Sequence, residues 1–109
     1  MKTLTIGDLK PRFPIIQGGM GVGISLSGLA SAVANEGGIG VISAAGLGLL
    51  YKKLSPSNYT EAGNLGLAEE IRKAREKAKG IIGVNVMVAL SDFAELVKTS
   101  IAEKVDIIF

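Results

Sequence analysis

Four short apolar runs, separated by stretches of helical periodicity, restrict the fold of this chain more than any other feature of its sequence. The runs cover residues 14–17, 39–43, 81–88 and 105–109. Apolar runs with little polar alternation are typical of parallel strands that are buried on both faces. Because strand and helix alternate, the predicted order is βαβαβαβ, an α/β fold with parallel strands and right-handed crossovers.

The helix between the second and third runs is the most clearly marked. Residues 67–79 carry acids at the start and bases at the end, and Gly80 follows as a stop. Their mixed charges predict a solvated face. The preceding residues 44–64 contain Gly, Pro, Ser and Asn together with two tyrosines, so we predict a long loop over a strand end.

The other two helices are predicted from their expected caps. From residue 25 apolar side chains recur at helical spacing, with Ser25 or Ser27 as the capping residue and Gly37 as part of the stop. Ser91 is expected to cap a third helix that runs to about residue 103, and Asp92 complements the dipole of that helix.

The length of the chain limits what these units can build. A closed (β/α)8 barrel usually needs roughly 250 residues, and this chain has 109. An open doubly wound sheet and the amino-terminal portion of a (β/α)8 TIM barrel both fit the pattern. The last apolar run stops at Phe109 without a polar tail. We therefore expect residues 1–109 to be a single domain fragment, with three βα units and the start of a fourth strand.

The composition excludes several classes of function. The absence of Cys and His removes disulfides, thiolate nucleophiles, imidazole bases and metal sites that use either residue. A net charge of +2, with the bases interleaved with acids, predicts no nucleic-acid surface. The polar first ten residues do not resemble a signal peptide, and no run is long and apolar enough for a membrane span, so a cytoplasmic location is expected.

The first candidate site is the loop after the first apolar run. Residues 17–23 read QGGMGVG and lie between a predicted strand and a helix, where parallel α/β folds bind phosphates and flat cofactors. The dinucleotide fingerprint G-x-G-x-x-G does not occur here, and Ser43 and Ala44 stand where a ribose-binding acid is expected. The glycines suit a planar tricyclic ring better, with Met20 as a polarizable neighbour. Alternatively, they form only a tight turn, and Met20 fills the core.

The second candidate is Asn85, a lone amide in an otherwise apolar strand. A buried amide without partners costs about 1–3 kcal/mol, so it must be satisfied by a ligand or by the protein. Its donors and acceptor suit the mixed edge of a flavin pyrimidine ring, whereas a structural amide would bond neighbouring backbone. Ser43 ends the preceding strand on the same predicted face.

Other polar residues have simpler explanations. The tyrosines and lysines of the long loop could contact a substrate, but an exposed loop of mixed charge is the more frequent explanation for them. They are Tyr51, Lys52, Lys53 and Tyr59.

Taken in order, these segments resemble the nitronate monooxygenase family, formerly called 2-nitropropane dioxygenases, and the FMN-dependent enoyl-acyl-carrier-protein reductases of the same fold. The matching segments are PIIQGGMG at 14–21, LA at 29–30 with Val33 and Ala34, EGGIGVIS at 36–43 and GVNVM at 83–87. They extend over nearly the whole chain. Each motif is weak alone, and their order makes the set specific.

The resemblance implies a (β/α)8 barrel with FMN at the carboxyl ends of the strands. Gly18, Gly19 and Met20 would line the flavin, Asn85 would contact its pyrimidine side, and Ser43 would be a further contact. The family's catalytic His and its FMN phosphate site lie further along the chain, so residues 1–109 contain no catalytic residue and are expected to be inactive alone.

The resemblance also implies the reaction. The full enzyme would oxidise alkyl nitronates with O2, and the alternative is reduction of an enoyl thioester by NAD(P)H. A third interpretation is a non-catalytic half-barrel that binds a partner or another copy of itself, because a half-barrel leaves sheet edges uncovered.

Overall fold

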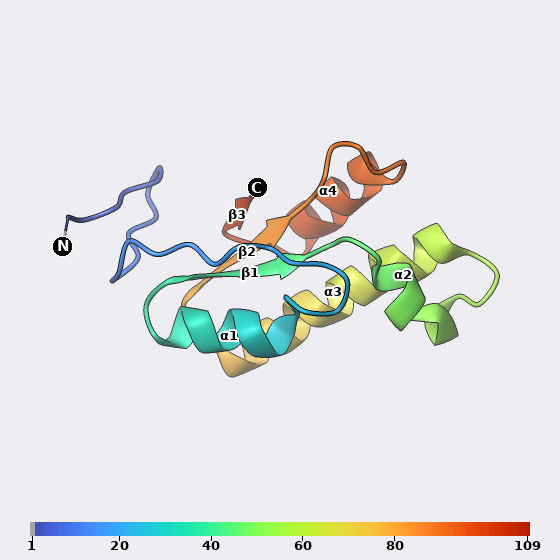
Figure 1. Ribbon diagram of the computed structural model, residues 1–109, viewed down its shortest axis with the longest axis horizontal. Helices are drawn as coiled ribbons and strands as arrows, with labels where there is room; N and C mark the ends of the chain where they lie inside the picture. The colour runs from blue at the N-terminus through green and yellow to red at the C-terminus, as the bar shows by residue number, and fades with distance from the viewer. Residues whose placement is uncertain (1) are drawn as a thin grey trace.

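Residues 2–109 are described by a computed structural model, which has three parallel strands and helices packed against them (Figure 1). The elements in chain order are α1 (Ser27–Asn35), β1 (Ile39–Ser43), α2 (Leu47–Leu50), the 3-10 helix η1 (Lys52–Leu54), α3 (Tyr59–Lys77), β2 (Ile81–Asn85), α4 (Phe93–Ala102) and β3 (Ile107–Ile108). The strand order is β1-β2-β3, and both pairings are parallel. The predicted α/β class with parallel strands is confirmed.

The first apolar run is not a regular strand, which corrects the prediction for residues 14–17. It lies parallel to β1 but forms a single bridge, between Ile16 and Ile39. The Gln17 backbone N–H donates to the Ile39 carbonyl at 3.0 Å. One step further on, the Gln17 side-chain amide takes the place of a backbone partner, accepting from Val41 N and donating to Val41 O at 3.0 Å each. The backbone hydrogen-bond ladder to β1 ends at Gln17, because the side chain of Gln17 bonds the backbone groups of Val41 that a further strand residue would use.

Of the three remaining predicted strands, β1 coincides with its apolar run at residues 39–43, whereas β2 and β3 are shorter than the runs that predicted them. β2 ends at Asn85 and not at residue 88, and Met87 and Val88 beyond it are exposed. β3 contains only Ile107 and Ile108, although Val86 N still donates to Phe109 O at 2.9 Å.

The core lies between the sheet and the pair α1 and α3, which run together below the sheet in Figure 1. Alternate strand residues face these helices, and the cluster includes Ala30, Ala34, Ile42, Leu67, Ile71, Ile82 and Val84. At Gly40, a Cβ atom would lie only 1.9 Å from the Ala30 carbonyl oxygen. The absence of a side chain at this position therefore sets how closely α1 approaches β1.

The predicted loop over residues 44–64 is wrong for much of its length, because α2 and η1 lie in its first half and α3 begins in its second half. α3 begins at Tyr59, and its first turn is capped by the Asn58 side chain, which accepts from Glu61 N at 3.0 Å. Gly63 and Gly66 lower the intrinsic helix propensity of this segment, so its sequence did not indicate a helix. They are used for packing, because a Cβ at Gly66 would lie 2.5 Å from the Tyr51 ring.

The predicted serine caps are also wrong. The residue before α1 is Leu26 and the residue before α4 is Asp92, and neither makes a side-chain capping bond. Ser27 lies inside the first turn of α1, and Ser25 is turned back toward the preceding loop. Among the described residues, no helix is both long and apolar enough to cross a membrane.

Candidate functional site

The carboxyl ends of β1 and β2 bring two of the predicted site residues together. Ser43 and Asn85 are partners in the parallel register. Side chains alternate between the faces of a strand, and Ile42 and Val84 belong to the core under the helices. Ser43 and Asn85 therefore lie on the opposite face, which is the inner face when such a sheet closes into a barrel.

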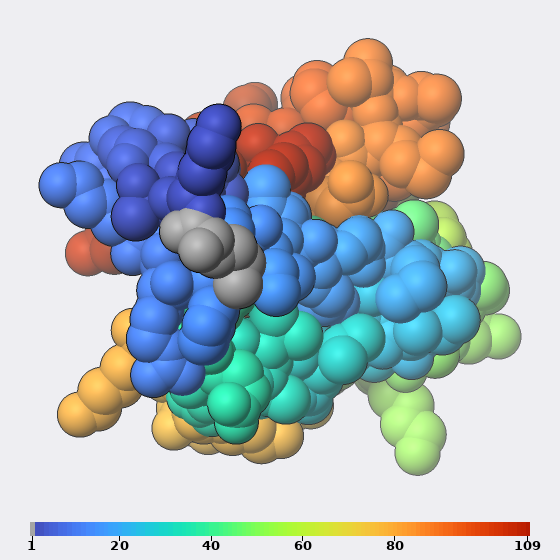
Figure 2. All heavy atoms as spheres, turned by 60° about the vertical axis from the view of Figure 1, so that its left-hand side comes forward, coloured from blue at the N-terminus to red at the C-terminus, as the bar shows by residue number. Residues whose placement is uncertain are grey.

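The glycine loop lies directly over this pair. A Cβ atom at Gly19 would be 2.6 Å from Asn85 Cβ, and one at Gly21 would be 3.2 Å from Ser43 Oγ. In Figure 2 the segment that precedes α1, in lighter blue, lies beside the segment after β2, in orange. Three of the predicted residues, Gly19, Ser43 and Asn85, thus share one location.

The outer side of the loop is open. A Cβ atom at Gly18 would meet no atom within 4 Å, and Met20 is 48% exposed. Met20 therefore does not fill the core of residues 2–109, which was the alternative explanation for it. Ser43 is only 3% exposed, and its backbone N–H donates to Ser25 O at 2.9 Å.

The Asn85 side chain is partly exposed, and none of the side-chain hydrogen bonds among residues 2–109 involves its amide, whose N and O atoms are therefore open to solvent and not enclosed by the protein. Its backbone carbonyl accepts from Ala44 N at 3.0 Å, as expected for a strand end. The alternative explanation was that neighbouring backbone groups satisfy the Asn85 amide, and no such backbone partner is found among residues 2–109. The amide is available to a ligand.

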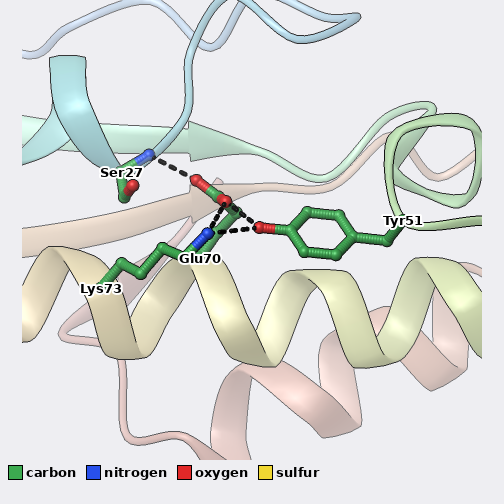
Figure 3. A network of polar contacts seen from close by, with 4 residues as sticks. All are labelled: Ser27, Tyr51, Glu70 and Lys73. Atoms are coloured by element: carbon green, nitrogen blue, oxygen red, sulfur yellow. Dashed lines mark hydrogen bonds and ion pairs between the residues drawn. The ribbon is translucent and has the colours of Figure 1, made fainter. Parts of the chain in front are cut away.

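A second polar cluster, centred on Glu70, was missed by the sequence analysis (Figure 3). Glu70 was assigned to a solvated helix face, yet it is 4% exposed. One carboxylate oxygen accepts from Ser27 N at 2.8 Å, and the other accepts from the Tyr51 hydroxyl. Lys73 Nζ lies 3.5 Å from the second oxygen and donates to the Tyr51 hydroxyl at 3.1 Å.

The spacing could have revealed this cluster. Leu67, Ile71 and Ala74 form the buried stripe of α3, and Glu70 lies within that stripe at i+3 from Leu67. A carboxylate in an apolar stripe requires partners, so Glu70 should have been expected to bind donors from neighbouring elements.

The electrostatics of the cluster favour a charged Glu70 and a neutral Tyr51. Burial raises the pKa of Glu70, but the hydrogen bonds from Tyr51 and Ser27 N outweigh it, so the pKa lies below its ordinary value. Burial, followed by the bond to the Glu70 carboxylate, raises the pKa of Tyr51. The negative charge sits at the amino end of α1, where the helix dipole stabilises it. Glu70 thereby supplies the cap that Leu26 cannot.

Comparison with protein families matches residues 2–107 to the family described as nitronate monooxygenase. The chain belongs to the nitronate monooxygenase family. A search of curated proteins finds no match. Among solved structures, FabK from Thermotoga maritima is similar, with a TM-score of 0.68 and 28% identity. The similarity covers 90% of this chain and 26% of the FabK chain, so this chain spans about a quarter of the length of that protein.

Family membership confirms the resemblance inferred from the glycine loop, the EGGIGVIS segment and the strand around Asn85. It also establishes the sheet as the amino-terminal part of a TIM-barrel fold of this family. Nitronate monooxygenases bind FMN. Active sites of such barrels lie at the carboxyl ends of the strands, where the loop and Asn85 are found.

The residues present fit one edge of a flat cofactor. The open backbone at Gly18 permits close approach of a ring, and the unpartnered Asn85 amide offers both donors and an acceptor. Several hollows in the described surface lie away from this site, one of them lined by Phe13, Ile15 and Val33. This is expected, because three strands form only part of a barrel wall and cannot enclose the site themselves.

Proposed function

We propose that this chain is the amino-terminal part of an FMN-dependent oxidoreductase that oxidises alkyl nitronates with O2. The observation that carries the proposal is the unpartnered Asn85 amide beside an open glycine loop at the strand ends. The FMN ring, when bound, supplies the electron transfer between substrate and oxygen. We take the catalytic His and the FMN phosphate site to lie further along the polypeptide, as the family resemblance implies, so the 109 residues alone are proposed to be inactive.

Each residue of the site has a defined task in this proposal. Gly18 and Gly19 let the backbone approach the ring, because neither carries a Cβ atom. Met20 offers a polarizable thioether at the ring edge. Asn85 donates to and accepts from the pyrimidine side of the ring. Ser43, the further predicted contact, is buried below Gly21 and would support the loop from beneath.

A second candidate is the FMN-dependent reduction of an enoyl thioester by NAD(P)H, which the structural similarity to FabK favours. The flavin is reduced by the nitronate in the first reaction and by NAD(P)H in the second. Assays of the full-length protein, the polypeptide that contains these residues, should therefore compare nitronate with O2 against enoyl thioester with NAD(P)H. Turnover of the thioester alone would replace the first candidate by the second.

We expect Asn85→Leu to weaken FMN binding by the full-length protein while leaving the fold largely intact. Leu is only moderately larger than Asn and also branches at Cγ, so the packing change should be tolerated. Ring atoms left unpaired in a water-poor site cost about 1–3 kcal/mol, or roughly tenfold to a hundredfold in affinity. FMN dissociation constants and apo-protein melting temperatures should be measured for both proteins.

The same measurements test the alternative that Asn85 is purely structural. In that case the melting temperature of the apo-protein would fall, and FMN affinity per folded molecule would equal that of the parent. Such a result would contradict a role of Asn85 in flavin binding.

We further expect the isolated chain, residues 1–109, to bind FMN weakly or not at all. Backbone amides at helix N-termini and in glycine-rich loops usually hold the phosphate of such a cofactor, and in this proposal they lie outside residues 1–109. A fluorescence titration with free FMN measures the affinity. Tight, stoichiometric binding would contradict this expectation.

A further inference from the structure

The hydroxyl of Ser25 is at the root of the glycine loop. Ser25 is 0% exposed, and its Oγ accepts from Met20 N at 2.9 Å and from the Gln17 side-chain amide at 3.1 Å. The same hydroxyl donates to the Gly18 carbonyl at 3.3 Å. A serine hydroxyl has one donor and two acceptor positions, so all of its capacity is used on residues 17–20.

The backbone of Ser25 joins the loop to the sheet. Its N–H donates to the Met20 carbonyl at 2.9 Å, and its carbonyl accepts from Ser43 N at 2.9 Å. Both peptide groups that flank Met20 are therefore tied through Ser25 to the carboxyl end of β1. A shift of Ser25 would move the loop relative to the strand end.

Gln17 anchors the other end of this arrangement. Its amide bonds both backbone groups of Val41 at 3.0 Å and uses its remaining donor on Ser25 Oγ. Because Val41 lies in the middle of β1, the start of the loop is fixed to the sheet through a side chain.

These hydrogen bonds are all made on the inner side of the glycine loop, so its outer side remains open to a ligand. Gly18 faces open space and Met20 is 48% exposed, while Gly19 is packed against Asn85. A simple helix cap would have directed the Ser25 hydroxyl toward α1, yet α1 has no side-chain cap from its preceding residue. The serine is directed instead at the segment that the proposed function places against FMN.

We propose that Ser25 is a positioning residue for the flavin, acting through the backbone of Gly18 and Met20. This inference rests on the proposed function. Ser25 does not touch the cofactor. It sets the position from which the loop meets the ring, and Gln17 holds Ser25 in place.

The test is Ser25→Ala in the full-length protein, with Ser100→Ala as the matched control. Ser100 is also 0% exposed, but its hydroxyl donates at 2.8 Å only to Leu96 O within its own helix α4. Ser25→Ala is expected to weaken FMN binding about tenfold and to shift the visible absorption bands of the bound flavin, because Met20 N loses its acceptor. Ser100→Ala should lower apo-protein stability while preserving FMN affinity and spectrum.

The outcomes separate this inference from the function on which it rests. A parent protein that binds no FMN overturns both. A parent that binds FMN, with Ser25→Ala showing parental affinity and spectrum, overturns the positioning role alone. If Ser25→Ala does not fold, Ser25→Cys replaces it, because a thiol has similar size and forms weaker hydrogen bonds. Reduced affinity of Ser25→Cys supports the inference, and parental affinity with an unaltered spectrum overturns it.

Discussion

Gly40→Ala is expected to destabilise the protein by about 3 kcal/mol or more, the upper range for overpacked cores. The added Cβ would lie 1.9 Å from the Ala30 carbonyl oxygen and 2.7 Å from the carbonyl carbon. Both belong to the backbone of α1, so no side chain can rotate away to relieve the clash. The helix would have to move off β1, and Gly40 lies in the strand whose residues are all buried. Urea unfolding of the full-length protein measures the loss.

Gly28→Ala is the matched control, with an expected effect of opposite sign. Gly28 is in α1, the helix against which Gly40 packs, and a Cβ atom at Gly28 would meet no atom within 4 Å. Replacing an exposed helical glycine by alanine should stabilise by up to about 1 kcal/mol, because alanine loses less backbone entropy on folding. If Gly40→Ala left the unfolding midpoint unchanged, the close approach of α1 to β1 would be wrong.

The sequence predicted those parts of the fold that depend on local pattern. β1 and β2 are continuous apolar runs, and the charged half of α3 has acids early and bases late, so each is recognisable alone. The amino-terminal half of α3 was missed because Gly63 and Gly66 suggest a loop. Their helical role depends on α2 and Tyr51, which pack closely against them, and such tertiary contacts override propensity.

The first predicted strand failed for a related reason. The run at residues 14–17 has the composition of a strand, but the Gln17 side chain occupies the hydrogen-bonding positions of Val41 that a longer strand would use. When a side chain replaces backbone groups in bonding a strand, the sequence shows no periodic pattern that would reveal it. Ser25 was predicted to be a helix cap because a serine just before a helix usually is one. Its hydroxyl instead bonds the backbone of the preceding glycine loop, and this depends on tertiary packing that local sequence does not show.

The candidate site was more predictable than the network around it. Parallel strands place their carboxyl ends together, so the adjacency of Ser43, Asn85 and the glycine loop followed from the order of elements. Whether Asn85 had a partner and whether Met20 was exposed depended on packing. The Glu70 cluster joins α3 to α1 and to the turn at Tyr51, and only the place of Glu70 in the buried stripe of α3 indicated it.

Glu70→Ala is expected to destabilise the protein by roughly 2–4 kcal/mol at pH 7, because it leaves one buried donor without an acceptor, at about 1–3 kcal/mol, and one half-buried donor, at about 1 kcal/mol. The donors are the Ser27 backbone N–H and the Tyr51 hydroxyl. Lys73, whose side chain is 44% exposed, can turn to water and should add little to the loss. Glu70→Gln keeps the shape and one acceptor oxygen, so its loss should be smaller.

The pH dependence of the difference between the parent and Glu70→Gln isolates the charge. The pKa of Glu70 is lowered in the folded protein, so the unfolded state binds its proton first as the pH falls. The stability from the carboxylate is therefore fully present above the unfolded pKa, about 4.3, and is lost as the pH falls through the lower folded value. Urea unfolding at pH 7, 5, 4 and 3 should show a constant difference at the two higher values and a shrinking one below. A difference that stayed constant down to pH 3, or grew, would mean that the Glu70 charge does not hold α1, α3 and the Tyr51 segment together.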